Sequence, residues 1–339
     1  MKRIAVILSG AVAKGAFEAG ALRELVKEDV TIVRIVAASA GALSGAMIAS
    51  GVRANTLAAT ADRLVTLWRD NATWGDSFHL SPLDLISGKG VSDQSKVIEL
   101  LRSEIQPNTG AGTDINLRVI TAPLNGAIGD IDGATATTFE HVLEFTGEDF
   151  DDAFALERMF TGVTASAAFP IAFSAVDVTQ DGAGPCIDGG MVNNTPVKWA
   201  LDGDIGQSVD AVFVIAPFTK SYTPGAQKLE GIHLVSHLAD MLINERLYRD
   251  LREAYQVNAA LLALQALIPT IGPGAYNQIL SIVGWAGRQV VPIYQIRPTA
   301  ELSGSAFTGF SSQNLREQYI DLGAAAAKAV LATIDWRAS

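Results

Sequence analysis

The chain has 339 residues, of which 49% are hydrophobic and 18% are charged, and its formal net charge is −11 at pH 7. This apolar share is large enough for the core of one large domain or two, and the acidic balance argues against nucleic acid as a partner. The same balance disfavours tight docking on anionic lipid but leaves neutral or zwitterionic lipid open.

The spacing of apolar residues predicts strands and helices that alternate along the chain. From the N-terminus we expect a strand at Lys2–Leu8, a helix at Lys14–Glu28, a strand at Thr31–Ala37 and helices at Ala40–Ser50 and Thr56–Trp68. Next we expect a helix at Val91–Ile105 capped by Ser92 or Asp93, a strand at Leu117–Ala122, a turn between short strands at Asn125–Gly133 and a helix at Asp152–Ala168. The last expected elements are a strand at Val209–Ala216, a helix at His233–Ile268, a strand at Val290–Ile296 and a helix at Ser312–Ile334. Such alternation predicts a mostly parallel sheet with helices on both faces.

The domain organisation predicted from the sequence is simple. No long linker rich in Ser, Gly or Pro divides the chain, and no internal repeat is visible. We therefore expect a single α/β domain over residues 1–339. Its motif-bearing core covers about 4–216, and a helical C-terminal portion with the last strand covers about 217–339.

The sequence indicates a cytoplasmic protein. The apolar stretch Ile4–Leu8 is shorter than the apolar part of a signal peptide and has the pattern of a strand. The longest apolar tract, Val257–Ile268, is interrupted by two amides and followed by Pro269, so it falls below the ~18 residues of a membrane span. The single cysteine, Cys186, excludes an internal disulfide and is compatible with a reducing compartment.

Ser39 follows a β-branched strand pattern directly and is surrounded by small residues, in Ala37-Ala-Ser-Ala-Gly41. A serine at a tight strand-to-helix turn is the nucleophile elbow of hydrolases, usually written G-x-S-x-G, and Ala37 stands here for the first glycine. The other interpretation of this pentapeptide is a serine that caps a helix rich in Ala and Gly.

A second motif, Leu8-Ser-Gly-Ala-Val-Ala-Lys-Gly15, lies between the first strand and the first helix. Backbone N–H groups at such a turn point outward and suit an oxyanion or a phosphate. Lys14 and Gly15 are followed by Ala16, which argues against a nucleotide-binding P-loop. A plain tight turn is the alternative.

A third motif, Asp188-Gly189-Gly190, is an ordinary turn sequence on its own. An acid on a rigid turn is also the base that a serine nucleophile requires, and this gives the motif a second interpretation.

In this order the three motifs resemble the patatin-like phospholipase family, from about Ile4 to Gly323. The block Thr164–Pro170 and the stretch Ile296–Pro298 before the last helix are similar to other parts of that family. The resemblance implies a three-layer α/β/α fold with a mostly parallel sheet. It also implies a serine lipid acyl hydrolase that cleaves fatty-acyl esters of phospholipids, lysophospholipids or neutral lipids, with lipid degradation as its role.

The resemblance also implies the site. Ser39 takes the position of the nucleophile and Asp188 that of its partner in a dyad without histidine. The oxyanion donors would be Gly10, Ala11 and Val12. The supporting residues that match the family's motifs are Lys14, Gly15, Gly41, Gly189 and Gly190.

The resemblance requires no metal or cofactor, and no cluster of Cys, His and carboxylates has metal-ligand spacing. The implied partner is a lipid or acyl-ester substrate, and transient contact with a membrane surface is compatible with it. No sequence feature indicates an oligomeric state.

Two alternatives remain at this point. His233 and His237 follow Asp188, which gives the Ser-Asp-His order of α/β-hydrolase esterases, although Ser39 comes earlier than that fold places its nucleophile. A catalytically weak or silent lipid-binding protein is the second alternative, because Ala11 and Val12 replace loop glycines and a β-branched residue favours negative φ.

Two segments outside the motifs are candidates for lipid contact. The apolar side chains of Tyr276–Trp285 are expected to pack in the core, with an apolar wall for acyl chains or an interfacial face as the alternative. The segment Asn71–Gly90 is a candidate lid or a long surface loop.

Overall fold

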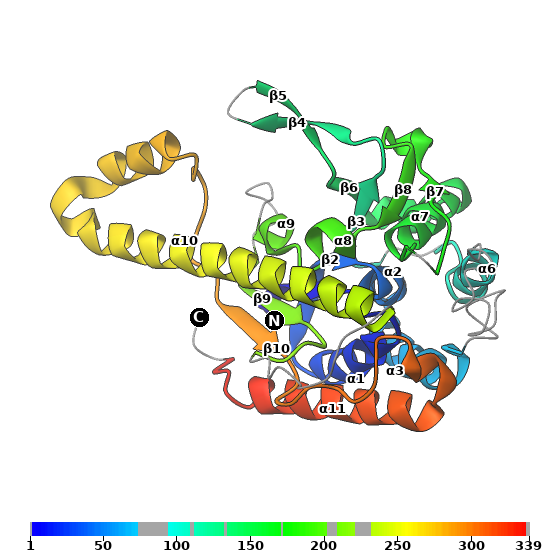
Figure 1. The fold of residues 1–339 in the computed structure, drawn as a ribbon. Coiled ribbons are helices and arrows are strands. Elements are labelled where there is room, and N and C mark those ends of the chain that lie inside the picture. The colour runs from blue at the N-terminus through cyan, green and yellow to red at the C-terminus, as the bar shows by residue number, and fades with distance from the viewer. Residues whose placement is uncertain are drawn as a thin grey trace.

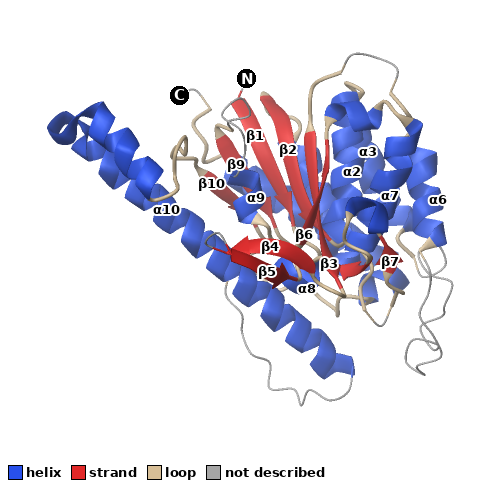
Figure 2. Cartoon of the chain, turned by 90° about the horizontal axis from the view of Figure 1, so that it is seen from above, coloured by secondary structure: helices blue, strands red, loops and turns tan. Residues whose placement is uncertain are grey.

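The computed structural model describes residues 2–73, 94–108, 112–131, 134–170, 172–201, 209–220 and 232–336. Within these ranges a mostly parallel sheet lies between two layers of helices (Figures 1 and 2), which confirms the predicted fold class. The sheet has the order β10-β9-β1-β2-β3-β8-β7, and β6 pairs with β3 beside this path.

The strands that form the parallel part of the sheet are β10 (Ile293–Ile296), β9 (Ala211–Ile215), β1 (Lys2–Leu8), β2 (Val30–Ala38) and β3 (Asn116–Pro123). The antiparallel strands at the far edge are β6 (His141–Phe145), β8 (Pro185–Asp188) and β7 (Val176–Asp177). A separate two-stranded ribbon consists of β4 (Ala127–Ile131) and β5 (Ala134–Thr138).

Strand β1 shows why the domain has three layers. Its side chains Ile4, Val6 and Leu8 belong to one core, and Ala5 and Ile7 belong to another. Successive side chains of a strand point to opposite faces, so a strand that is apolar at every position needs helices on both sides.

The first core is covered by α1 (Ala16–Leu25), α2 (Ala40–Arg53), α3 (Leu57–Thr66), α7 (Ala153–Ser166) and α11 (Gln313–Leu331). The second core is covered by α9 (Val197–Leu201) and the long helix α10 (Ile232–Ile282). The remaining described helices are η1 (Val12–Gly15), η2 (Leu67–Asn71), α6 (Ser95–Glu104), η3 (Gly147–Phe150), η4 (Thr179–Asp181), α8 (Gly190–Asn193) and η6 (Thr308–Ser311).

Several predicted boundaries were wrong for local reasons. The first helix begins at Ala16, because the loop before it winds into the 3-10 turn η1. The expected turn Asn125–Gly133 contains strand β4, whose ladder with β5 supplies its hydrogen bonds. Helix α6 begins at Ser95 with Gln94 as its N-cap, and Ser92 and Asp93 lie outside the described residues.

The largest difference concerns α10, which we expected to end at Ile268. Its helical structure continues through Pro269 and Pro273 to Ile282, and the direction changes at Gly272, whose φ is 78°. Glycine takes a positive φ at little cost, so the turn between the two helical parts falls at this residue.

One described helical segment, Asn244–Ile282, is long and apolar enough, by length and composition, to cross a membrane. Just 6% of its most apolar window is buried. We expected no membrane span because no apolar run in the sequence was long enough without interruption. Isolated amides interrupt a run of this kind, but they leave the mean hydropathy of the segment high.

Candidate active site

Ser39 occupies the sharp turn between β2 and α2. Its backbone has φ 55° and ψ −133°, a conformation that residues other than glycine rarely adopt. Its N–H donates to Ser166 Oγ over 2.9 Å, and the helix α2 begins at the next residue. The turn therefore places the Ser39 side chain at the positive end of the α2 dipole.

Asp188 ends strand β8 and lies beside this serine. Ser39 Oγ donates to Asp188 Oδ2 over 2.6 Å, and the N–H of Gly190 donates to Asp188 Oδ1 over 2.7 Å. The exposed fractions are 6% for Ser39 and 1% for Asp188. We expected this pair from two separate sequence motifs, and in the structure the two side chains are in direct contact.

Burial of Asp188 raises the pKa of its carboxyl group from 3.8 to about 7, and the hydrogen bonds from Ser39 and Gly190 lower it in part. Removal from water disfavours the charged form of a carboxylic acid. An acid with a pKa near the operating pH is well suited to accept and return a proton.

The end of helix α7 is hydrogen-bonded both to Ser39 and to the segment of Asp188. This role was not predicted from the sequence. Ser166 Oγ accepts the N–H of Ser39, and the carbonyl of Ser166 accepts the N–H of Gly189. The carbonyl of Ala168 accepts the N–H of Asp188 over 3.0 Å. The small residues of this segment could be recognised in the sequence. Their contact with Ser39 could not be predicted, because it joins positions 127 residues apart.

The loop Gly10–Val12 passes over Ser39. A Cβ on Gly10 would lie 2.1 Å from Ser39 Cβ, so a residue with a side chain does not fit there. In the described part of the chain, the N–H groups of Gly10 and Ala11 make no hydrogen bond with the protein, whereas those of Ala13 and Lys14 donate to the carbonyls of Ala306 and Ala11.

Val12 adopts φ 53°, so the expectation of a negative φ at this β-branched residue was wrong. Packing overrides the local preference, because the 3-10 turn η1 starts at Val12 and the following amide is fixed to Ala306. The backbone therefore takes the left-handed conformation that a glycine would take at this position.

Asn194 also holds the loop Gly10–Val12 in place, and this role was not predicted from the sequence either. Its Nδ2 donates to the carbonyl of Gly10 over 2.8 Å, and its side chain is buried. The C=O and N–H of one peptide point in opposite directions. The bond to the carbonyl of Gly10 therefore sets the direction of the Ala11 N–H.

The supporting residues predicted from the sequence lie around Ser39 and Asp188. A Cβ on Gly41 would lie 2.5 Å from the carbonyl of Leu8, and one on Gly189 would lie 1.9 Å from that of Ile120, so both glycines allow close packing on the sheet. The lack of a side chain at Gly15 likewise allows the ring of Trp68 to pack closely against it. Lys14 lies within η1, with its N–H on the carbonyl of Ala11.

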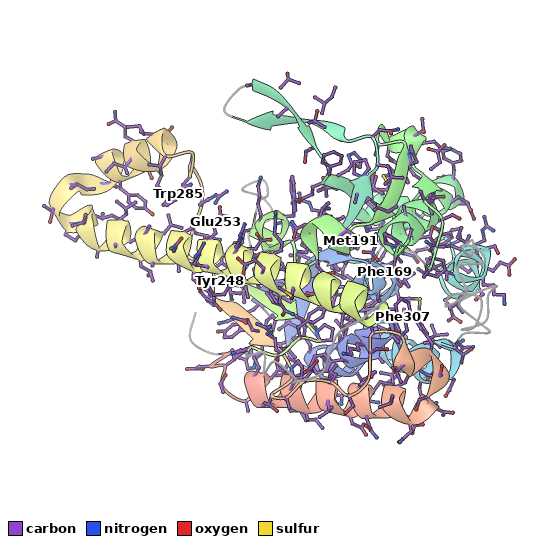
Figure 3. All side chains as sticks on the ribbon, in the orientation of Figure 1. Phe169, Met191, Tyr248, Glu253, Trp285 and Phe307 are labelled. Atoms are coloured by element: carbon purple, nitrogen blue, oxygen red, sulfur yellow. The ribbon has the colours of Figure 1, made fainter. Side chains whose placement is uncertain are left out.

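A pocket with mostly apolar walls opens beside Ser39, between helices α2, α3 and α6. Ser39 and Val12 form part of its wall. Its apolar side chains are Leu43, Met47, Leu64, Leu67, Trp68, Val97, Leu100, Leu101, Phe169, Phe173, Phe307 and Phe310. Figure 3 shows Phe169 and Phe307 near one another at this end of the molecule. Trp74 and Phe78 of the candidate lid lie outside the described residues.

The Ser-Asp-His alternative requires an imidazole between the serine and the acid. Ser39 Oγ donates to Asp188 directly, which leaves no imidazole between them. The side chains of His233 and His237 are not among those that the structure describes. Among the described residues no group of three His, Cys, Asp or Glu side chains is arranged to hold a metal ion.

A serine at a strand-to-helix turn, hydrogen-bonded to a buried carboxylate beside an apolar pocket, has the arrangement of a serine acyl hydrolase. A family model described as patatin-like phospholipase matches residues 6–201, more than half of the chain. The chain belongs to the patatin-like phospholipase family, whose members are lipid acyl hydrolases.

Solved structures similar to this chain include VipD from Legionella pneumophila and ExoU in complex with SpcU from the type III secretion system of Pseudomonas aeruginosa. VipD is 13% identical with a TM-score of 0.42, and the match covers 98% of this chain and 67% of that chain. ExoU is 16% identical with a TM-score of 0.32, and the match covers 99% and 72% of the respective chains. No curated protein sequence matches this chain.

Proposed function

We propose that this chain hydrolyses fatty-acyl esters of phospholipids, lysophospholipids or neutral lipids through an acyl-enzyme on Ser39, with Asp188 as the acid and base. The observation that carries the proposal is the 2.6 Å hydrogen bond between two buried side chains, Ser39 and Asp188. A buried carboxylate that accepts a serine hydroxyl is a base in place for nucleophilic attack.

In the first half of the reaction Ser39 Oγ attacks the ester carbonyl and its proton passes to Asp188 Oδ2. The tetrahedral intermediate collapses, the C–O bond to the alcohol breaks, and Asp188 returns the proton to the leaving oxygen. In the second half Asp188 takes a proton from a water molecule, which attacks the acyl carbon. The bond from that carbon to Ser39 Oγ then breaks, Asp188 returns the proton to Ser39 Oγ, and the fatty acid leaves. The pKa of about 7 at Asp188 supports both directions of transfer.

The charge that develops on the carbonyl oxygen needs donors that the fold has not already used. The N–H groups of Gly10 and Ala11 meet this requirement, because they make no hydrogen bond within the described protein. Val12 lies at the start of the same turn, and its left-handed backbone keeps the loop close to Ser39. We assign the oxyanion hole to these three residues.

The apolar pocket supports a fatty-acyl group as the part of the substrate that is recognised. Leu43 and Met47 lie one and two turns after Ser39 on α2, so Met47 is about 12 Å along the helix from the nucleophile. Met47→Trp is expected to lower the turnover of long acyl chains more than that of short ones. Equal loss for both would contradict the assignment of this pocket to the acyl chain.

Labelling by a fluorophosphonate and hydrolysis of a medium-chain ester test the reaction. Ser39→Ala is expected to abolish both, with a loss on the order of 10⁴-fold or more in turnover. The control is Ser103→Ala on α6, an exposed serine outside the pocket, which is expected to keep both.

Three outcomes would overturn parts of the proposal. Activity retained in Ser39→Ala would remove the nucleophile assignment. A folded His233→Ala, His237→Ala double variant with turnover lower by several orders of magnitude would favour the triad. A wild type that binds fatty acid but neither labels nor turns over would establish the silent lipid-binding protein.

A further inference from the structure

Helix α10 and the segment after it form an apolar hairpin, residues Ala254–Gly287, that projects from the domain (Figures 1 and 2). These 34 residues contain no Asp, Glu, Lys, Arg or His. They belong to a chain with a net charge of −11, in which charged residues make up 18% of the total. An exposed stretch of this length without charge is unusual on a surface that contacts only water.

The apolar hairpin has two helical arms joined at Gly272. Leu261 on the first arm and Leu280 on the second are buried, while Leu262 is 55% exposed and Ile282 is 76% exposed. The two prolines next to the turn lack an N–H, so the bend carries fewer backbone donors that need water. The tip is therefore suited to surroundings without water.

The base of the apolar hairpin is fixed to the sheet. Asn258 Nδ2 donates to the carbonyl of Val291 over 2.7 Å, and the N–H of Val291 donates to Asn258 Oδ1 over 3.2 Å. Tyr255 Oη accepts from Gln295 Nε2 over 2.9 Å. These bonds hold the hairpin in a defined direction relative to the domain.

The apolar hairpin is separate from the pocket. Figure 3 shows Trp285 at the hairpin and Phe169 and Phe307 toward the other end of the molecule. No residue of Tyr276–Trp285 lines the described pocket, so this segment does not form an apolar wall for acyl chains there. Its exposure leaves the interfacial face as the interpretation of this segment that still applies.

The directions of the exposed side chains favour a fluid apolar phase over a protein partner. Leu262 and Leu267 are both about half exposed, and five positions on a helix separate their directions by roughly 140°. One flat protein surface does not cover both, whereas lipid surrounds an inserted helix on all sides. A helix that exposes large apolar side chains in two such different directions is typical of a helix in a core or a membrane.

The dimensions agree with insertion. The first arm, Ala254–Ile271, has 18 residues and a length of about 27 Å, close to the ~30 Å of a bilayer's hydrocarbon core, and the second arm is shorter. Tyr255 lies at the base of the first arm, where an amphipathic aromatic ring meets the headgroups.

We propose that the apolar hairpin inserts into a bilayer of zwitterionic lipid and holds the domain at the membrane surface. This proposal goes beyond the proposed function, because insertion requires no catalysis. The absence of charge on the hairpin matches hydrocarbon, and the net charge of −11 selects against anionic headgroups.

Flotation with phosphatidylcholine vesicles tests insertion in a Ser39→Ala background, where hydrolysis cannot alter the vesicles. We expect the protein to float with the vesicles, and Leu262→Glu with Ile282→Glu to weaken partitioning at least tenfold. The matched control is Leu322→Glu on α11, which is 48% exposed and lies outside the hairpin, and it is expected to float as before. Vesicles with anionic lipid are expected to bind less protein.

The proposal is overturned if the protein does not float, or if the hairpin variants float as well as the Leu322→Glu control. It is also overturned if light scattering shows a dimer that Leu262→Glu dissociates, because the hairpin would then be a subunit interface. Hydrolysis of a soluble short-chain ester is measured separately in the Ser39 form. Loss of flotation with retained hydrolysis therefore contradicts insertion alone.

Discussion

At the candidate active site, polar side chains such as Ser39 and Asp188 are almost completely buried, whereas on the apolar hairpin side chains such as Leu262 and Ile282 are exposed. Both regions reverse the usual distribution of polar and apolar groups. The buried polar groups are stabilised by hydrogen bonds from distant segments, whereas the apolar side chains of the hairpin stay exposed among the residues that the structure describes.

The two regions differ in what takes the place of water around their side chains. A buried carboxylate is tolerated because neighbouring donors replace water, and its altered pKa is useful in a reaction. An exposed apolar helix is tolerated where something other than water covers it. Four predictions test whether the two regions are as independent as this comparison requires.

The largest effect is expected from Asp188→Asn. An amide cannot accept the serine proton, so turnover of a medium-chain ester is expected to fall on the order of 10³-fold. Vesicle flotation is expected to stay at the wild-type level, because Asp188 is bonded to Ser39 in the wall of a pocket to which no residue of the apolar hairpin contributes. A variant within threefold of wild-type turnover would show that another group is the base.

A smaller loss is expected from Asn194→Ala, which removes the donor to the carbonyl of Gly10. We expect kcat to fall about 10- to 100-fold with little change in KM, because the loop donors act on the transition state. Asn193→Ala is the matched control, since Asn193 is equally buried but donates to Glu140. Equal kcat in the two variants, at equal thermal stability, would remove the positioning role of Asn194.

The pH dependence should follow the raised pKa of Asp188. Its ionised form is the base, so kcat/KM is expected to fall tenfold per pH unit below about 7. Stability should change in the opposite sense. The folded state keeps a proton that the unfolded state releases near pH 4, so the free energy of unfolding falls as the pH rises from about 4 to 7.

Urea unfolding at pH 5 and pH 8 measures this second effect. Wild type is expected to lose up to a few kcal/mol relative to Asp188→Asn between the two values. A constant difference between the two proteins would mean that Asp188 is already ionised at pH 5.

The smallest effect is expected from Val12→Gly. Relief of φ 53° at a β-branched residue stabilises the folded state by about 1–3 kcal/mol, and the extra freedom of glycine in the unfolded chain offsets about 0.4–1 kcal/mol. We expect a net gain of about 1 kcal/mol by thermal unfolding and turnover within threefold. Ala11→Gly is the control and should lose stability, because the φ of Ala11 is −157°.

Much of the fold could be predicted from local pattern. The apolar run Ile4–Leu8 predicted a buried strand, and the small residues around Ser39 predicted a tight turn with a helix cap as the alternative. The end of α10 could not be predicted in this way, because prolines that normally stop a helix are tolerated next to the bend at Gly272. The single-domain organisation and the cytoplasmic location stay predictions.

The candidate site could be predicted as far as its motifs reached. Ser39 and Asp188 each carry a local signature, and the order of the motifs suggested their pairing. The roles of Ser166 and Asn194 depend on contacts across 127 and 184 residues, which leave no periodicity in the sequence. The conformation of Val12 also follows from its surroundings and opposes its intrinsic preference.

The double hydrogen bond of Asn258 with Val291 has a consequence for protein engineering. It joins the two ends of an excursion of 32 residues, 259–290, at one point of the sheet edge. An excursion whose ends already meet can be exchanged for a short turn with a small change in closure entropy. Residues 259–290 are thus expected to be removable as a unit, because the helix before them and the segment after them stay joined by Asn258 and Val291.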